Sequence, residues 1–221
     1  VTFGGRVEMR SFDGKLETGL NYIDEDGAIG DRGRSKLASV DAELELSNKT
    51  RIIGEYATSQ YDGVEADSVS ADAYLLELQH ASDGFSAGAY VRQEDAGFGL
   101  GQTASNTNAI RRVGAQSSVR IAESIDADTG TRNVSRIEGQ AYRETDLASD
   151  QNRTVSDASI TREGKNYAAS TGLRSVQEEL NDENRESLLG TFSFRKSFPK
   201  AGISVVGSRE QPISQSDEAS I

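Results

Sequence analysis

The segment 38–56 alternates between apolar and charged residues with a period of two, and this pattern constrains the fold more than any other feature of the chain. In its first half the even-numbered residues are apolar, and the odd-numbered ones include the carboxylates of Asp41, Glu43 and Glu45. Successive side chains of a β-strand point to opposite faces, so a strand here has one apolar and one acidic face. A helix would scatter the three carboxylates around its circumference. Turn-forming residues at 47–50 interrupt the alternation before it resumes, and the segment therefore predicts a β-hairpin.

The same alternation recurs along most of the chain and predicts an all-β, antiparallel, up-and-down meander of about twelve strands. The expected strands are 6–10, 16–22, 38–46, 51–57, 74–79, 85–92, 113–121, 136–142, 157–161, 167–174, 188–195 and a last one that begins at 203. Short turns such as Asp13-Gly14, a hairpin signal, alternate with long polar connections. The long connections are expected at 24–34, 59–70, 93–108, 144–152 and 177–186.

Composition excludes several classes of protein. The 221 residues include no Cys, so there is no disulfide framework, no thiolate metal site and no cysteine nucleophile. A net charge of −12 argues against nucleic acid as a partner, because phosphate binding needs clustered Lys and Arg. The hydrophobic content of 35% is low for a compact, water-excluding core, and no apolar run approaches the roughly 18 residues of a transmembrane helix.

Dyad alternation, strands of roughly nine to eleven residues, and short turns that alternate with long loops are the features expected of a transmembrane β-barrel. Lipid cannot satisfy backbone hydrogen bonds, so a sheet that spans a membrane must close on itself. Its outer face is then apolar, while its wet interior tolerates charge.

With this pattern from about Thr2 to Gly207, and in stretches such as 89–101 (AYVRQEDAGFGLG), the chain resembles the bacterial outer-membrane β-barrels, in particular the barrels of large Gram-negative surface proteins. The resemblance implies an outer-membrane location, up-and-down topology and short turns that face the periplasm. Twelve strands with a short first turn put both ends of the chain on the long-loop rim, whereas complete barrels of this family keep their termini in the periplasm. We therefore expect a slice of a larger barrel, with residues 1–210 as the barrel domain and 211–221 as a polar tail.

In a barrel, the two sets of alternating residues on each strand face opposite sides of the sheet, one toward the lumen and one toward lipid. The charged residues expected to face the lumen are Arg6, Glu8, Arg10, Glu17, Asp41, Glu43, Glu45, Glu55, Glu77, Arg92, Arg120, Glu138, Arg174 and Arg195. The residues expected to face lipid are Leu16, Leu20, Tyr22, Val40, Leu44, Leu46, Ile52, Tyr56, Tyr74, Leu76, Leu78, Val113, Val119, Ile137, Tyr167, Leu173, Leu188, Phe192 and Phe194. The acidic residues either form a patch that favours cations or lie on a solvated face without selectivity, and we expect the arginines to pair with them across strands.

Two sequence features invite a more specific chemistry. The segment 126–130 (DADTG) resembles the start of a calcium loop, but the distal bidentate Glu is missing, so we expect a turn and no metal site. His80 is the only histidine and would have to serve any Ser-His-Asp hydrolase. Because it follows Leu78 on the apolar parity, just before the turn at 82–84, we expect it to be structural.

Three functions remain open at this stage. The first is a passive pore, or a membrane anchor for surface-displayed domains of the same polypeptide, with outer-membrane lipid as its surroundings and no enzymatic activity or cofactor. The second is a soluble extracellular β-rich adhesin or binding module that buries the apolar parity inside a sandwich. The third is an outer-membrane enzyme that uses His80.

Overall fold

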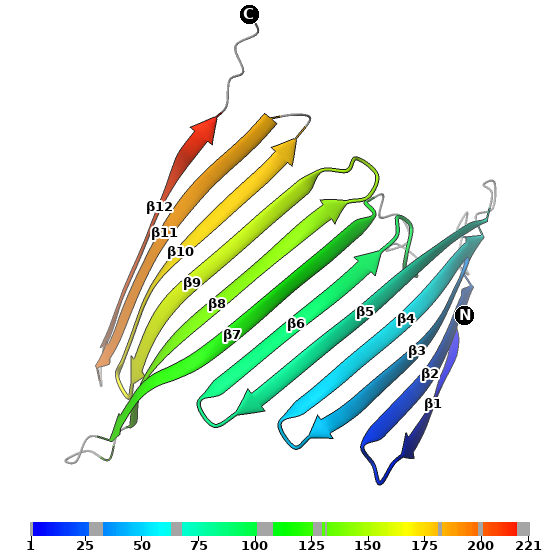
Figure 1. Ribbon diagram of the computed structural model, residues 1–221, viewed down its shortest axis with the longest axis horizontal. Coiled ribbons are helices and arrows are strands. Elements are labelled where there is room, and N and C mark those ends of the chain that lie inside the picture. The colour runs from blue at the N-terminus through cyan, green and yellow to red at the C-terminus, as the bar shows by residue number, and fades with distance from the viewer. Residues whose placement is uncertain are drawn as a thin grey trace, which may run out of the picture. The chain divides into compact units, whose positions relative to one another are not determined.

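The chain is all-β in the computed structural model, which describes residues 2–26, 33–62, 68–100, 108–125, 130, 132–180, 183–198 and 201–215. The strands are β1 (Thr2–Ser11), β2 (Leu16–Asp26), β3 (Arg34–Ser47), β4 (Thr50–Asp62), β5 (Val69–Ser82), β6 (Phe85–Glu94), β7 (Ile110–Ile125), β8 (Arg132–Asp146), β9 (Asn152–Gly164), β10 (Tyr167–Leu180), β11 (Glu183–Phe198) and β12 (Ala201–Gln215) (Figure 1). Within these ranges there is no helix of the length and hydropathy that a bilayer crossing requires.

Each strand is hydrogen-bonded to the next one along the chain, so the sheet order is β1 to β12 without a crossover. This confirms the predicted antiparallel meander. The two ends of the order, β1 and β12, are not neighbours, so the sheet is not closed into the expected barrel.

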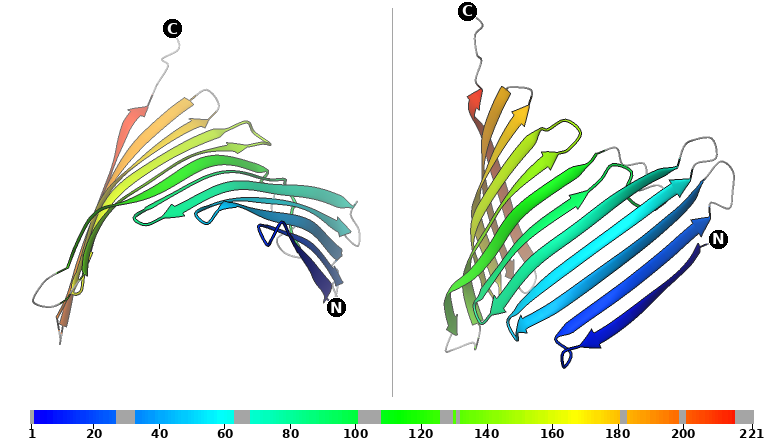
Figure 2. Two further views of the ribbon diagram at one scale, coloured as in Figure 1. Left: turned by 60° about the horizontal axis from the view of Figure 1, so that its bottom comes forward. Right: turned by 45° about the vertical axis from the view of Figure 1, so that its right-hand side comes forward.

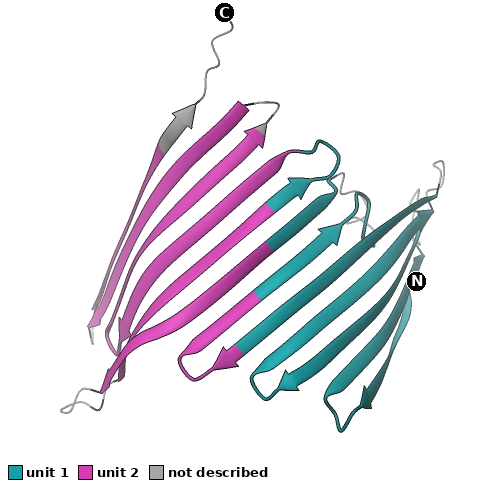
Figure 3. Ribbon diagram, viewed as in Figure 1, with its two compact units in different colours: residues 1–80, 89–113, 144–150 teal, residues 81–88, 114–143, 151–221 magenta. Residues whose placement is uncertain are grey.

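The chain divides into two compact units, which are described separately (Figure 3). Unit 1 contains residues 1–80, 89–113 and 144–150, and unit 2 contains residues 81–88, 114–143 and 151–221. In unit 1, β1 to β4 run side by side, in blue and cyan, in both views of Figure 2.

The opening hairpin confirms the prediction from the segment 38–56. β3 pairs with β4 so that Val40 lies opposite Tyr56 and Leu44 lies opposite Ile52. The register with β2 adds Leu20 beside Val40. Apolar residues of neighbouring strands therefore share one face, because side chains that are directly opposite in the register point the same way.

The turn between β1 and β2 forms where Asp13-Gly14 predicted it. Gly14 N donates to Ser11 O over 3.1 Å, and Lys15 N donates to Phe12 O over 3.1 Å. Three consecutive residues adopt positive φ, with values of 53° at Phe12, 56° at Asp13 and 85° at Gly14. Asp and Gly tolerate this left-handed conformation, which explains why the turn forms at this dipeptide.

The second half of the chain corrects three expected boundaries. The expected acidic loop at 177–186 is wrong, since β10 continues to Leu180 and β11 begins at Glu183. The connection expected at 144–152 is only 147–151, and β12 runs to Gln215, into the expected tail. The calcium-like segment lies outside the described residues, apart from its last residue, Gly130.

The ends of β10 and β11 form an acidic two-stranded ribbon where the sequence predicted a loop, and polar contacts between the two strands and with β9 explain why it forms. Gln177 lies opposite Glu186 and donates to it over 3.2 Å, and Arg153 lies opposite Glu178 at 3.2 Å. Neither face of this ribbon is apolar, so its residues carry no alternation that a sequence pattern can detect. Strand pairing nevertheless satisfies its backbone groups.

The register of this ribbon can be tested with disulfides, because the chain contains no Cys. We expect the double variants Gln177→Cys/Glu186→Cys and Glu178→Cys/Arg185→Cys to form a disulfide on oxidation, because the two residues of each pair lie directly opposite each other. Of the two, the non-hydrogen-bonded pair should link faster, because its Cα atoms lie closer together. The shifted pair Gln177→Cys/Arg185→Cys places its thiols on opposite faces and is the control. Disulfide formation is measured by gel mobility with and without reductant. Equal linking of all three pairs would contradict the strand pairing and favour the predicted loop at 177–186.

Candidate functional site

In unit 1, the strand registers bring most of the charged residues expected in the lumen onto one face of the sheet. These residues are Arg6, Glu8, Arg10, Glu17, Asp41, Glu43, Glu45, Glu55 and Glu77. We call this the charged face of unit 1, and its opposite the apolar face. Since the members come from five strands, the face is a product of the pairing between strands.

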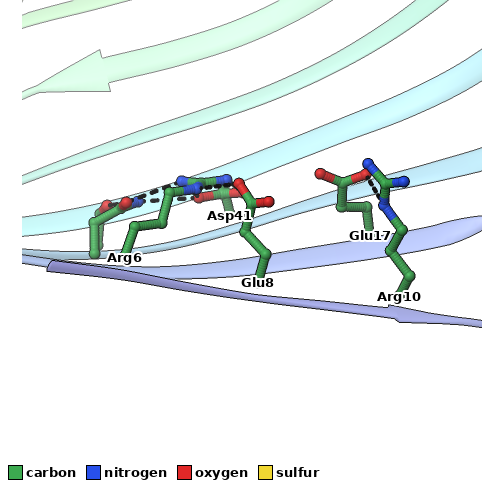
Figure 4. Close-up of polar contacts among 7 residues, drawn as sticks. Arg6, Glu8, Arg10, Glu17 and Asp41 are labelled. Carbon is green, nitrogen blue, oxygen red and sulfur yellow. Dashed lines mark hydrogen bonds and ion pairs between the residues drawn. The ribbon is translucent and has the colours of Figure 1, made fainter.

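An ion-pair cluster joins β1, β2 and β3 on the charged face (Figure 4). The guanidinium of Arg6 binds both carboxylate oxygens of Asp41, with Nη1–Oδ1 at 2.7 Å and Nη2–Oδ2 at 3.0 Å. Its Nε donates to Glu8 over 2.5 Å. Asn21 of β2 accepts from Arg6 over 2.9 Å and donates to Asp41 over 3.1 Å. One arginine therefore engages two carboxylates, and an amide supports the pair.

Gly19 makes room for this cluster. It lies beside Asp41 in the register, and a Cβ at this position would lie 2.6 Å from both Arg6 Nη2 and Asp41 Oδ1. A separation that short does not occur between real Cβ atoms and their neighbours. The small residue in the middle of β2 is therefore what allows a side chain from β1 to reach one on β3.

Other carboxylates of the charged face differ in whether they are paired. Arg10 binds Glu17 at 2.9 Å and Arg51 binds Glu43 at 3.0 Å, in agreement with the expected pairing across strands. Among the described residues, no ion pair engages Glu45, Glu55 or Glu77. The charged face of unit 1 therefore keeps an excess of free negative charge.

The apolar face of unit 1 carries no charge over three consecutive rows of paired residues. The rows are Ser11–Leu16–Leu44–Ile52–Leu78, Met9–Thr18–Ala42–Gly54–Leu76 and Val7–Leu20–Val40–Tyr56–Tyr74. Many of these side chains are exposed, including Leu20 at 61% and Leu76 at 52%. Charged groups begin beyond these rows: Asp24 accepts from Arg34 over 2.8 Å and from the Tyr22 hydroxyl over 3.2 Å.

In unit 1 the buried residues lie on the charged face of the sheet and not on the apolar face. The buried residues of unit 1 outside its loops, Ser35, Ala57, Ser59 and Ala71, lie on the charged face together with Gly19. In a water-soluble domain the apolar side is the buried one. Here large apolar side chains are exposed, and small or polar residues are enclosed.

Unit 2 also has one face of its sheet on which large apolar side chains gather. Arg174 and Arg195 share one face with the fully buried Val155, and Arg174 lies 3.7 Å from Asp157. The opposite face carries Tyr167, Leu173, Leu188, Phe192 and Phe194, of which Leu173 is 59% exposed. This face also carries Arg162, opposite Ala169, and Arg209, opposite Gly190, so charge and apolar surface are less completely separated than in unit 1.

The remaining expected residues lie on strands as follows. Arg120 of β7 binds Asp83 at 3.0 Å and Glu123 at 2.7 Å, and Glu138 of β8 lies 3.6 Å from Arg136. Among the described residues Arg92 of β6 forms no ion pair. The apolar side chains of Leu46, Val113, Val119 and Ile137 are exposed.

His80 sits opposite Thr50, whose hydroxyl lies 2.9 Å from its Nδ1. This contact joins two neighbouring strands, which agrees with a structural role. The ranges that the structure describes contain no group of three or more His, Asp or Glu side chains placed to hold a metal ion.

One feature escaped the sequence patterns. The segment Asp95–Leu100, after β6, crosses onto the charged face, where Gly99 N donates to the buried Ser59 Oγ over 3.1 Å. The only sequence signal is the pair Gly97 and Gly99, which indicates a turn but not its direction.

No family model, curated protein or solved structure matches this chain.

The cluster around Arg6 predicts a matched pair of glycine variants. Gly19→Ala forces Arg6 or Asp41 to move, and we expect the free energy of unfolding to fall, because the bidentate contact between the two side chains is weakened. Gly5→Ala is the control, because a Cβ there meets no atom within 4 Å. Urea titration followed by circular dichroism measures both variants. Equal stability of the two would mean that the Arg6–Asp41 pair contributes nothing.

Proposed function

We propose that this chain forms the wall, or part of the wall, of a membrane-spanning β-barrel in a Gram-negative outer membrane. Its role there is passive: a water-filled pore, or the anchor that displays other domains of the same polypeptide. The observation that carries the proposal is the inverted distribution of residues, with exposed apolar side chains on one face and enclosed or ion-paired polar ones on the other. Lipid on the apolar face and water on the charged face satisfy both sets of groups.

The length of the apolar stripe on β3 supports a bilayer. On this strand alone the apolar residues run from Ala38 to Leu46, about 27 Å at roughly 3.4 Å per residue, whereas across the sheet Asp72 already lies in the row of Ala38. Strands of transmembrane barrels tilt by about 35–45°, which reduces the height to about 20 Å, close to the apolar band of roughly 25 Å in such barrels.

The border of the band supports the same conclusion. Tyr22, Tyr56 and Tyr74 lie at one edge of the uncharged rows, and the ion pair of Asp24 with Arg34 lies just beyond Tyr22. Tyrosines at the boundary between apolar and charged surface are typical of the aromatic girdles of membrane barrels, because the ring is apolar and the hydroxyl is polar.

Closure is a requirement of this proposal. The outer edges of β1 and β12 leave backbone groups that lipid cannot satisfy. In a membrane these edges pair with each other or with further strands of the same polypeptide. The sequence-based expectation of a slice from a larger barrel corresponds to the second arrangement.

The soluble adhesin is the rival function, and it requires a second layer over the apolar face. In unit 1 the residues that the structure describes supply no such layer, since Leu20, Val40, Leu76 and Leu78 are exposed. The low hydrophobic content favours this rival, but the placement of the apolar residues favours lipid. Cooperative folding of the monomeric chain in buffer without detergent would contradict the membrane barrel and favour the soluble adhesin.

Two adjacent leucines of β5 provide a matched test of which face meets lipid. Leu76 lies in the middle uncharged row of the apolar face, and Leu75 lies on the charged face opposite Glu55. In lipid vesicles we expect Leu76→Arg to lower the free energy of unfolding by about 2–4 kcal/mol, the cost of an arginine at mid-bilayer, and Leu75→Arg to lower it less. The measurement is the urea midpoint of the vesicle-bound chain. A larger effect at Leu75 would contradict the proposal.

Conductance separates the pore from the anchor. Because free carboxylates are in excess on the charged face, we expect cation-selective current across a planar bilayer, with a reversal potential that moves toward zero in the triple variant Glu45→Gln/Glu55→Gln/Glu77→Gln. Asp13→Asn, in the turn between β1 and β2, is the control with unchanged selectivity. Inserted protein without current would leave only the anchor role.

A further inference from the structure

The segment Asp95–Leu100 is held against the charged face of unit 1 by its own backbone geometry. Phe98 N donates to Asp95 O over 3.2 Å, and Gly97 and Gly99 adopt φ values of 82° and 129°. The bond from Gly99 N to Ser59 Oγ anchors the segment on β4, where Ser59 is only 3% exposed. The chain therefore folds back over the face that the sheet alone would leave open.

A cavity of about 330 Å³ lies beside this segment, within unit 1. The charged face of β4 and β5 forms its floor, with Arg92 of β6, Phe98 and Ile110 around it. The floor is low because Ala57 lies directly opposite Ala73, and two methyl groups leave space that larger side chains would fill. The volume is at the lower end of the range for small-molecule sites, which is roughly 300–1,000 Å³.

The cavity is lined by charged groups that do not neutralise each other through ion pairs. Glu55 on β4 and Arg92 and Glu94 on β6 line it, and none of the three has an ion-pair partner among the described residues. Since β5 separates their strands, their backbones are about 10 Å apart, at roughly 4.8 Å per strand spacing. The remaining charged group of the lining, Arg112, is occupied by Glu144, to which its Nε donates over 2.8 Å.

We propose that this cavity binds a small zwitterion with an apolar body, that is, a hydrophobic amino acid or dipeptide. Its carboxylate pairs with Arg92 and its ammonium group with Glu55, while its side chains contact Leu75, Phe98 and Ile110. A simple anion would leave the carboxylates of Glu55 and Glu94 unmatched, and a simple cation would leave Arg92 unmatched, so complementarity favours a ligand that carries both charges. This inference goes beyond the proposed function and does not depend on it, because the cavity lies within the described fold of unit 1.

The chain contains no Trp, so Phe98→Trp introduces a single fluorescent reporter at the cavity. We expect titration of the folded variant with the dipeptide Leu-Leu to give a saturable change in fluorescence. N-acetyl-Leu-Leu-amide has the same apolar body without the charges, and we expect it to bind at least tenfold more weakly. Calorimetric titration of the unaltered chain with Leu-Leu repeats the measurement without the reporter.

Charge variants in the same background identify the site. We expect Arg92→Gln and Glu55→Gln each to weaken Leu-Leu binding at least tenfold, and Glu45→Gln, on the same face but outside the cavity, to leave binding unchanged. Ala73→Leu fills the floor and abolishes binding.

Circular dichroism and gel mobility establish that each variant is folded, so loss of binding is distinguishable from loss of the barrel. The inference is overturned by the absence of saturable binding to the folded, unaltered chain, or by equal affinity for the charged and uncharged peptides. Affinities that are insensitive to both charge variants would overturn it as well.

Discussion

The register of hydrogen bonds between neighbouring strands is the constraint on which the rest of the structure depends. A shift of one residue between β2 and β3 would move Asp41 to the side of Leu20 and Val40 to the side of Arg6, and Asp41 would lose its contact with Arg6. Because side chains alternate along each strand, the same bonds that pair the backbones also sort the side chains into two chemically distinct faces. The uncharged rows and the ion-pair cluster are therefore two results of one register.

The two faces call for different surroundings. On the charged face of unit 1, Arg6 is shared between Asp41 and Glu8, and small residues such as Gly19, Ala57 and Ala73 leave room for long side chains and for a cavity. On the apolar face, large side chains meet no covering layer among the described residues of the unit. A wet interior and a lipid exterior match this arrangement, which supports the proposed membrane wall more than a sandwich with a dry core.

The sequence predicted the strands whose two faces differ, and it missed those whose faces are alike. The hairpin from 38 to 56 and the Asp13-Gly14 turn formed as predicted, because each has a local signal: alternation in the first, left-handed conformers in the second. The polar ribbon around Glu178 and Arg185 has no such signal, and only its partners across the sheet explain it. For the same reason the parity of charged residues was predictable, but the choice of Asp41 as the partner of Arg6 was not.

The amino-acid sequence by itself determined the class of fold, the two-sided character of the sheet and the positions of most turns, since these follow from the order of residues along one strand or one turn. The tertiary structure alone decided the register between neighbouring strands, which carboxylates are paired and which form no ion pair within the described residues, and where the segment Asp95–Leu100 goes. The physical reason is the distance along the sequence over which each interaction acts. Alternation and turn conformation act between residues a few positions apart, whereas Gly99 and Ser59 are 40 positions apart and meet only after β4, β5 and β6 have assembled.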